Sequence, residues 1–144
     1  MMLVSQKSHY ALRAVYELAK HQGQGPINMS FNAEKQGIPP RFLGAILYQL
    51  KLDGIVVSRR GADGGYLLAR EAGDITVFDV FSSVQGAVEL GGGGDSESLD
   101  FDVFKQFWQN MEKSITTSLQ ATSIQEFVRL ELERMESYQA NYSI

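Results

Sequence analysis

Apolar residues recur at helical spacing through the first third of the chain, and this pattern predicts three helices. The first covers residues 3–20, with Ser5 suited to the N-cap. Its apolar stripe is Tyr10, Ala11, Ala14, Val15, Leu18 and Ala19. A short second helix is expected to be capped by Ser30 or Asn32 and to end near Gln36. The third begins at Pro40, and its predicted buried stripe is Phe42, Leu43, Ile46, Leu47 and Leu50.

The second and third helices together predict a helix-turn-helix. Gly37 suits the left-handed residue of the tight turn between them. In this motif the first residues of the second helix face the base edges of DNA. The exposed stripe there is Arg41, Gly44, Ala45 and Tyr48. Arg41 can pair with guanine or with phosphate, and Gly44 either allows close approach of DNA or is a tolerated neutral position.

A β-hairpin is predicted directly after the third helix. Asp53-Gly54 ends that helix, and the β-rich runs 55–58 and 66–68 flank a glycine-rich tip. Residues 27–29 are too short for an independent strand but can add to the hairpin edge. Gly61, Gly64 and Gly65 permit positive φ and leave little bulk, so the tip can press against a minor groove. The alternative is a solvated turn with two incidental arginines, Arg59 and Arg60.

The second half of the chain predicts further helices around a flexible loop. Residues 71–74 are expected to form a loop, and Thr76 with Asp79 has the form of a capping box that opens a helix. Residues 91–98 have the glycine-rich and acidic composition of a flexible loop. The longest helix is expected from Asp100 or Asp102 to about Ala121. A second capping box at Ser123 opens a last helix, which is expected to fray after residue 131.

The long helix carries an apolar seam of the kind that pairs with another helix. Its members alternate in steps of four and three; they are Phe104, Trp108, Met111, Ile115 and Leu119. This seam predicts dimerisation, although it can instead pack only on its own domain. The expected organisation is a winged-helix DNA-binding domain at 1–86, a flexible Gly/acidic loop at 87–101 and dimerisation helices at 102–144. The predicted fold is therefore mostly α with a small β-hairpin wing: a winged helix-turn-helix plus a long C-terminal dimerisation helix.

Charge is divided unevenly along the 144 residues, whose net charge is −4. Residues 1–75 hold nine Lys/Arg and six Asp/Glu, whereas residues 76–144 hold four and eleven. A modestly basic front and an acidic back fit a protein that contacts DNA with one end, although such asymmetry is common between halves of ordinary domains. The chain has no apolar run of membrane-spanning length and no export signal, so we expect a cytoplasmic protein with no membrane partner.

Several strings resemble the Rrf-type winged-helix regulators, a family that includes iron–sulfur, nitric-oxide and cysteine-metabolism regulators. The most specific is Arg60-Gly61-Ala62-Asp63-Gly64-Gly65-Tyr66-Leu67-Leu68. Others are Tyr10-Ala11-Leu12-Arg13-Ala14, Gln36-Gly37-Ile38-Pro39 with Phe42-Leu43, and Ile75-Thr76-Val77 with Asp79-Val80. The resemblance is tight over residues 3–85 and looser afterwards.

The resemblance implies a homodimer that binds palindromic or near-palindromic promoter sites. Carried onto this sequence, Tyr10 would contact phosphate, residues of the third helix would lie over the major groove, and Arg60 would enter the minor groove. The expected DNA-binding residues are Lys7, Tyr10, Arg41, Phe42, Gly44, Ala45, Arg59, Arg60, Gly61, Gly64, Gly65 and Tyr66. Iron–sulfur members carry a glutamate where this chain has Gly44, so its major-groove contacts should differ.

A larger departure lies between Glu89 and Val103. Cluster-binding members place three cysteines in this interval, whereas the whole chain contains none. Iron–sulfur clusters are held mainly by thiolates, and Asp95, Glu97 and their acidic neighbours cannot replace them. A hard-cation site from these carboxylates is conceivable, but a solvated acidic loop is favoured. We therefore expect no cluster, haem or metal, and a signal that is a small molecule, a partner protein or simply protein abundance.

These observations predict a dimeric, sequence-specific DNA-binding transcriptional regulator, a repressor, without an iron–sulfur cluster. The alternative is a protein-interaction module that docks a metabolic enzyme or other partner through its acidic C-terminal half. DNA affinity that falls steeply with salt would distinguish them. An enzyme is not expected, because the sequence has no nucleophile elbow, no phosphate-binding glycine motif and no plausible His–carboxylate set.

Overall fold

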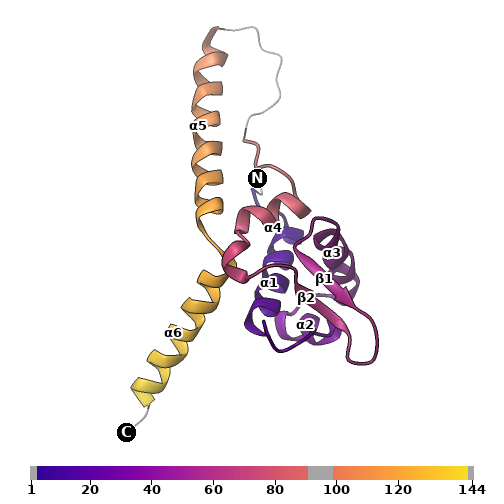
Figure 1. Ribbon diagram of the computed structural model, residues 1–144. Coiled ribbons are helices and arrows are strands. Elements are labelled where there is room, and N and C mark those ends of the chain that lie inside the picture. The colour runs from indigo at the N-terminus through magenta and orange to yellow at the C-terminus, as the bar shows by residue number, and fades with distance from the viewer. Residues whose placement is uncertain (1–2, 91–98, 143–144) are drawn as a thin grey trace.

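The computed structural model describes residues 3–90 and 99–142, with side chains from residue 103 onward in the second stretch. A compact body contains α1 (Gln6–Lys20), α2 (Met29–Gln36), α3 (Pro40–Leu52), β1 (Val56–Arg59), β2 (Gly65–Leu68), the 3₁₀ helix η1 (Ala72–Asp74) and α4 (Val77–Val84). Two long helices follow, α5 (Leu99–Ala121) and α6 (Ile124–Tyr142). In Figure 1 both project from one side of the body, while α3 and the hairpin occupy the other side.

The first three helices form as the sequence predicts, with two corrections. Ser5 caps α1 by accepting a hydrogen bond from the Ser8 N–H, and Gly37 takes the left-handed conformation after α2 (φ 63°). The cap of α2 was wrongly predicted, because Asn28 performs it: its side chain accepts from the Ser30 N–H at 2.7 Å. Asn32 is instead buried and donates to the Ala14 carbonyl at 3.2 Å, which joins α2 to α1.

Phe42 was wrongly placed in the buried stripe of α3. Leu43, Ile46, Leu47 and Leu50 are all buried, whereas Phe42 is 45% exposed. Leu43 points directly into the core, and its neighbour Phe42 is turned by about 100° around the helix, which brings its ring to the surface. The aromatic ring is therefore available on the outside of the body.

The hairpin is a two-stranded antiparallel sheet in which Val56 pairs with Leu68 and Arg59 with Gly65. The expected third strand is reduced to a single bridge between Ile27 and Tyr66, which exchange two backbone hydrogen bonds of 2.9 Å. This bridge fixes the outer edge of β2 to the segment that precedes α2.

The start of α6 belongs to the same hydrophobic core as the first three helices. Thr76 and Ser123 form a bridge, in which the Val77 N–H donates to the Thr122 carbonyl and the Ile124 N–H donates to the Ile75 carbonyl. Ile75 and Ile124 are both fully buried. The junction of α5 and α6 is therefore fixed to the body, although both helices extend beyond it.

Two expectations for the second half were wrong and one was confirmed. Residues 72–74 form η1 instead of a loop, because buried Ala72 anchors them to the core. The tail does not fray after residue 131, since α6 continues to Tyr142, with Arg129 bonded to Glu126 and Glu133 and Arg134 bonded to Glu131 at spacings of three or four residues. The capping box of Thr76 and Asp79 is confirmed. The loop predicted at 91–98 lies outside the described residues.

Candidate nucleic-acid interface

The first turns of α1 and α3 enclose an open notch on the surface. Its volume is about 390 Å³, and it is lined by Gln6, Lys7 and Tyr10 from α1 and by Phe42, Ala45 and Ile46 from α3. Pro40 occupies the first helical position of α3, so Phe42 is its third residue. The notch therefore lies at the helix end that faces base edges in a helix-turn-helix.

Two aromatic rings line the notch, one from each helix, and a guanidinium group lies against each ring. Tyr10 and Phe42 stack with ring centroids 6.3 Å apart and planes inclined by 23°. The guanidinium of Arg13 lies 5.1 Å from the Tyr10 ring, and that of Arg41 lies 4.7 Å from the Phe42 ring. Such cation–π contacts place positive charge at the edge of an apolar surface.

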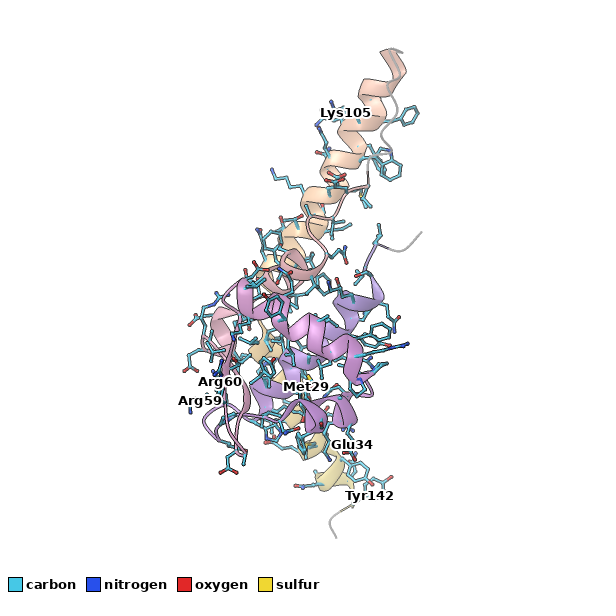
Figure 2. All side chains as sticks on the ribbon, turned by 90° about the vertical axis from the view of Figure 1, so that its right-hand side faces the viewer. Met29, Glu34, Arg59, Arg60, Lys105 and Tyr142 are labelled. Carbon is cyan, nitrogen blue, oxygen red and sulfur yellow. The ribbon has the colours of Figure 1, made fainter. Side chains whose placement is uncertain are left out.

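The hairpin presents a second set of cations. Arg59 and Arg60 are exposed and project outward from the hairpin (Figure 2). Gly61 has a φ of 110°, which suits glycine at the turn. At Gly64 a Cβ would meet the Arg60 carbonyl oxygen at 3.0 Å and the Arg59 carbonyl still closer. Gly64 is therefore required by the tight return of the tip, and not by a positive φ as the sequence suggested.

The cations of these two regions remain available for a ligand. In the described part of the chain, the ion pairs involve Lys20, His21, Arg70, Arg129 and Arg134. None involves the five cations near the notch and the hairpin, which are Lys7, Arg13, Arg41, Arg59 and Arg60. α3 and the hairpin lie on the side of the body away from α5 and α6 (Figure 1), whereas α1 lies between α3 and α6 and contacts both. This distribution suits a polyanion that contacts both.

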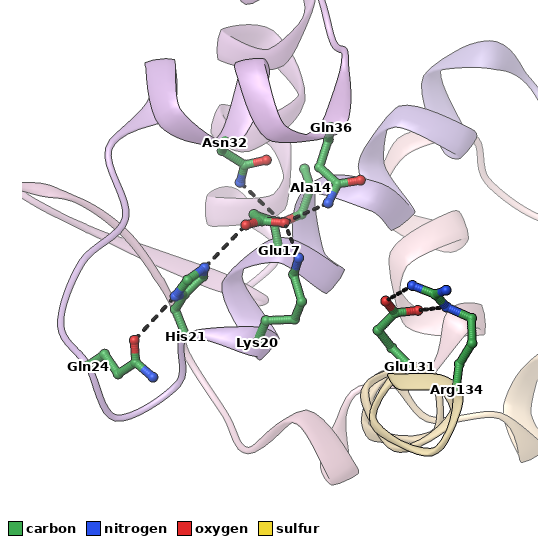
Figure 3. Close-up of polar contacts among 9 residues, drawn as sticks. All are labelled: Ala14, Glu17, Lys20, His21, Gln24, Asn32, Gln36, Glu131 and Arg134. Atoms are coloured by element: carbon green, nitrogen blue, oxygen red, sulfur yellow. Dashed lines mark hydrogen bonds and ion pairs between the residues drawn. The ribbon is translucent and has the colours of Figure 1, made fainter. Parts of the chain in front are cut away.

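A buried carboxylate fixes α1 against α2 behind this surface. Glu17 is 1% exposed and accepts hydrogen bonds from Gln36 at 2.6 Å and from Lys20 at 2.9 Å, while a ring nitrogen of His21 lies 3.2 Å away (Figure 3). Burial alone would raise the pKa of Glu17, but its hydrogen bonds and the Lys20 charge outweigh burial and hold the pKa below its usual value. Glu17 is therefore an anion in the folded protein at neutral pH.

The helix α4 holds both walls of the notch. The Gln85 side chain, at its C-terminal end, accepts from the Ser5 N–H at 3.0 Å and from the Ser8 hydroxyl at 2.8 Å. The Ser83 hydroxyl donates to the Asp53 carboxylate at 2.5 Å, and this bond lowers the pKa of Asp53. The start of α1 and the end of α3 are thus both bonded to α4.

Some of the residues predicted to bind DNA are partly buried and contact the rest of the fold. Tyr66 is half-buried and packs against the core, so its ring supports the hairpin. Gly44 is half-buried, and a Cβ there would lie 3.7 Å from the Met29 sulfur, an ordinary contact. The fold itself does not require glycine at position 44. Arg13 was missed by the sequence analysis, although its spacing of three from Tyr10 places both on one helical face.

The α5 seam lacks a partner within the described chain over most of its length. Phe104, Trp108 and Met111 are exposed, as is Phe107, which contacts Trp108 edge to face. Leu119 departs from the expected seam, because it packs against the core of its own domain. An apolar surface of this extent on a helix that projects from the body is suited to pairing with another helix.

Comparison with known proteins gives one consistent result. The model of the Rrf2 family, described as iron-dependent transcriptional regulators, matches residues 4–130. The HTH-type transcriptional regulator IscR of Xenorhabdus nematophila is 33% identical over 131 residues, which cover 89% of this chain and 80% of the relative. The structure of CymR, the global cysteine regulator of B. subtilis, matches with a TM-score of 0.80 at 26% identity, covering 90% of this chain and 98% of that one.

A second solved structure, T. potens IscR, has a TM-score of 0.73 at 35% identity and covers 88% of this chain and 85% of that one. The family match extends through the helix-turn-helix, the hairpin and α5, and into α6. These matches confirm the predicted winged-helix fold and the family resemblance. The chain belongs to the Rrf2 family of DNA-binding transcriptional regulators.

Proposed function

We propose that the protein is a homodimeric, sequence-specific transcriptional repressor that works without an iron–sulfur cluster. The start of α3 enters the major groove, and Arg60 at the hairpin tip enters the adjacent minor groove. Arg59, Lys7 and Tyr10 contact the phosphate backbone. The observation that carries this proposal is a set of exposed cations on α1, α3 and the hairpin of a winged-helix fold, which form no ion pair with any described residue.

Dimerisation is proposed through the exposed part of α5. Phe104, Phe107, Trp108 and Met111 would be covered by the same helix of a second copy, in a twofold contact where each helix faces its equivalent. A twofold dimer supplies two recognition helices, which a palindromic site requires at a separation of about one DNA turn. The position of α5 and α6 away from α3 and the hairpin supports this arrangement (Figure 1).

The family is described as iron-dependent, but the residues of this chain do not fit an iron–sulfur cluster. Such clusters are bound mainly by cysteine thiolates, and the chain has no cysteine. Among the described side chains, those of residues 3–90 and 103–142, no group of three or more His, Asp or Glu is arranged to hold a metal ion. Regulation through a small molecule, a partner protein or protein abundance is therefore favoured over iron sensing.

The alternative, in which the acidic C-terminal half docks a partner protein, has weaker support. Glu126 and Glu133 pair with Arg129, and Glu131 pairs with Arg134, all on α6 itself. These pairs lower the pKa of Glu126 and Glu131 through the neighbouring arginines and reduce the net negative field of the helix. Among the described helices, none has the length and apolar character needed to span a membrane.

The decisive experiment is selection of bound sequences from random duplex DNA, followed by affinity measurements over a range of salt concentrations. We expect one enriched site with twofold symmetry and an affinity that falls steeply with salt as counterions are released. Arg60→Ala should weaken binding most at sites with A·T-rich flanks, and Arg134→Ala on α6 is the matched control. An equal loss of affinity on all flanking sequences would show that Arg60 contacts only phosphate. Failure to enrich any sequence would refute the proposed function.

A further inference from the structure

The notch between α1 and α3 is apolar where a DNA-binding surface is usually polar. Tyr10, Phe42, Ala45 and Ile46 supply most of its lining, and Phe42 leaves 45% of its surface exposed. An exposed phenyl ring gains free energy when an apolar group covers it. The notch therefore favours an apolar ligand near the start of α3.

The major groove offers an apolar group that meets this requirement. Guanine, cytosine and adenine present hydrogen-bond donors or acceptors there, whereas thymine also presents its 5-methyl group. Phenylalanine and alanine are side chains that contact this methyl group in protein–DNA complexes. Phe42 and Ala45 lie in the first two turns of α3, which are the turns that approach base edges.

The charge around the notch favours DNA over a protein occupant. Lys7 lines the notch, and Arg13 and Arg41 lie against its two aromatic rings. Of the described residues that line the notch, none is acidic. An apolar peptide would leave these cations without compensation, whereas a duplex brings phosphates on both sides of the groove.

We infer that the notch receives the 5-methyl group of a thymine in the major groove, and that Phe42 makes binding selective for thymine at that position. The inference rests on the proposed function, because it specifies which base the start of α3 distinguishes. The stacked Tyr10 ring holds the Phe42 ring in place, and Ala45 is small enough to leave room for the methyl group.

The test replaces each thymine of the selected DNA site by uracil, which removes only the 5-methyl group. With the wild-type protein, we expect one thymine in each half-site at which uracil weakens binding about fourfold, the effect of one buried methyl group. Phe42→Ala should reduce this thymine-to-uracil ratio to about one. Its salt dependence should stay as in the wild type, because no phosphate contact is lost.

Two further variants keep the result interpretable. Phe42→Leu retains an apolar side chain and should preserve most of the thymine preference. Tyr48→Ala removes an exposed ring from the same helix outside the notch and should leave the thymine-to-uracil ratio unchanged, whatever its effect on affinity. Because Phe42 and Tyr48 are both exposed, circular dichroism should show both alanine variants folded.

Four results would overturn the inference. Uracil at every thymine position could bind as tightly as thymine, or the preference could persist in Phe42→Ala; in either case DNA binding and the proposed function would stand. Conversion of the dimer to a monomer by Phe42→Ala would assign the notch to a contact between copies. Absence of salt-dependent DNA binding in the wild type would remove the proposed function and this inference together.

Discussion

Replacement of Gly65 by alanine should destabilise the protein strongly, because the backbone of Ile27 occupies the space of the new Cβ. That atom would lie 2.9 Å from the Asn28 nitrogen and closer still to the Ile27 carbonyl, and all of these are backbone atoms. The chain can respond only by opening the bridge between Ile27 and Tyr66, which consists of two hydrogen bonds of 2.9 Å. Two net hydrogen bonds contribute about 2 kcal/mol, and the φ of 155° adds about 1 kcal/mol of strain for alanine.

Urea unfolding of Gly65→Ala should therefore show a loss of about 3 kcal/mol relative to the wild type. Gly73→Ala is the matched control, since a Cβ there meets nothing within 4 Å and the φ is not positive. The control should be neutral or more stable by about 0.5 kcal/mol, because alanine restricts the unfolded chain. Equal stability of the two variants would show that Ile27 does not hold the hairpin edge in solution.

Two other predictions concern the buried carboxylate and the α5 seam. Glu17→Gln should lower the free energy of unfolding by about 2 kcal/mol at pH 7. The pKa of Glu17 is lower in the folded than in the unfolded protein, where it is about 4.3. The difference in stability between wild type and variant is therefore fully present above about pH 4.3 and should shrink as the pH falls through the folded pKa. Urea unfolding at several pH values measures it, and a pH-independent difference would contradict the ion-pair explanation. Trp108→Glu should shift the dimer toward monomer in sedimentation experiments. Lys113→Glu should not, because Lys113 lies about two and a half helical turns from Phe104 and therefore on the opposite face of α5. A dimer unchanged by both substitutions would place the interface elsewhere.

Local sequence signals were sufficient to predict most elements of the fold. The Ser5 cap, the left-handed Gly37 and the capping box at Thr76 each depend on side chains within a few residues of the helix end. Their physical causes are short-range, so they could be inferred without knowledge of the tertiary structure. The family resemblance, which rests on the sequence of the hairpin tip, supplied the arrangement of these elements.

The misplaced residues are those whose environment depends on a distant segment. Asn32 was expected to cap its own helix, but its amide is used to bond the Ala14 carbonyl on α1. Phe42 fits a buried stripe by spacing alone, but in the structure its ring stacks on Tyr10 at the surface and stays 45% exposed. A periodic pattern states which residues share a face, but it does not state which neighbouring element covers that face.

The position of the candidate site likewise depends on contacts that no local pattern indicates. The two walls of the notch belong to α1 and α3, and each wall is bonded to α4: Gln85 accepts from Ser5 and Ser8, and Ser83 donates to Asp53. A third helix that lines no part of the notch therefore joins α1 to α3, in addition to the direct contact between them. The helix α4 also packs against α5. The surface proposed to contact DNA and the helix proposed to mediate dimerisation therefore both contact α4. A displacement of α4 would therefore alter both the surface proposed to contact DNA and the helix proposed to pair with a second copy.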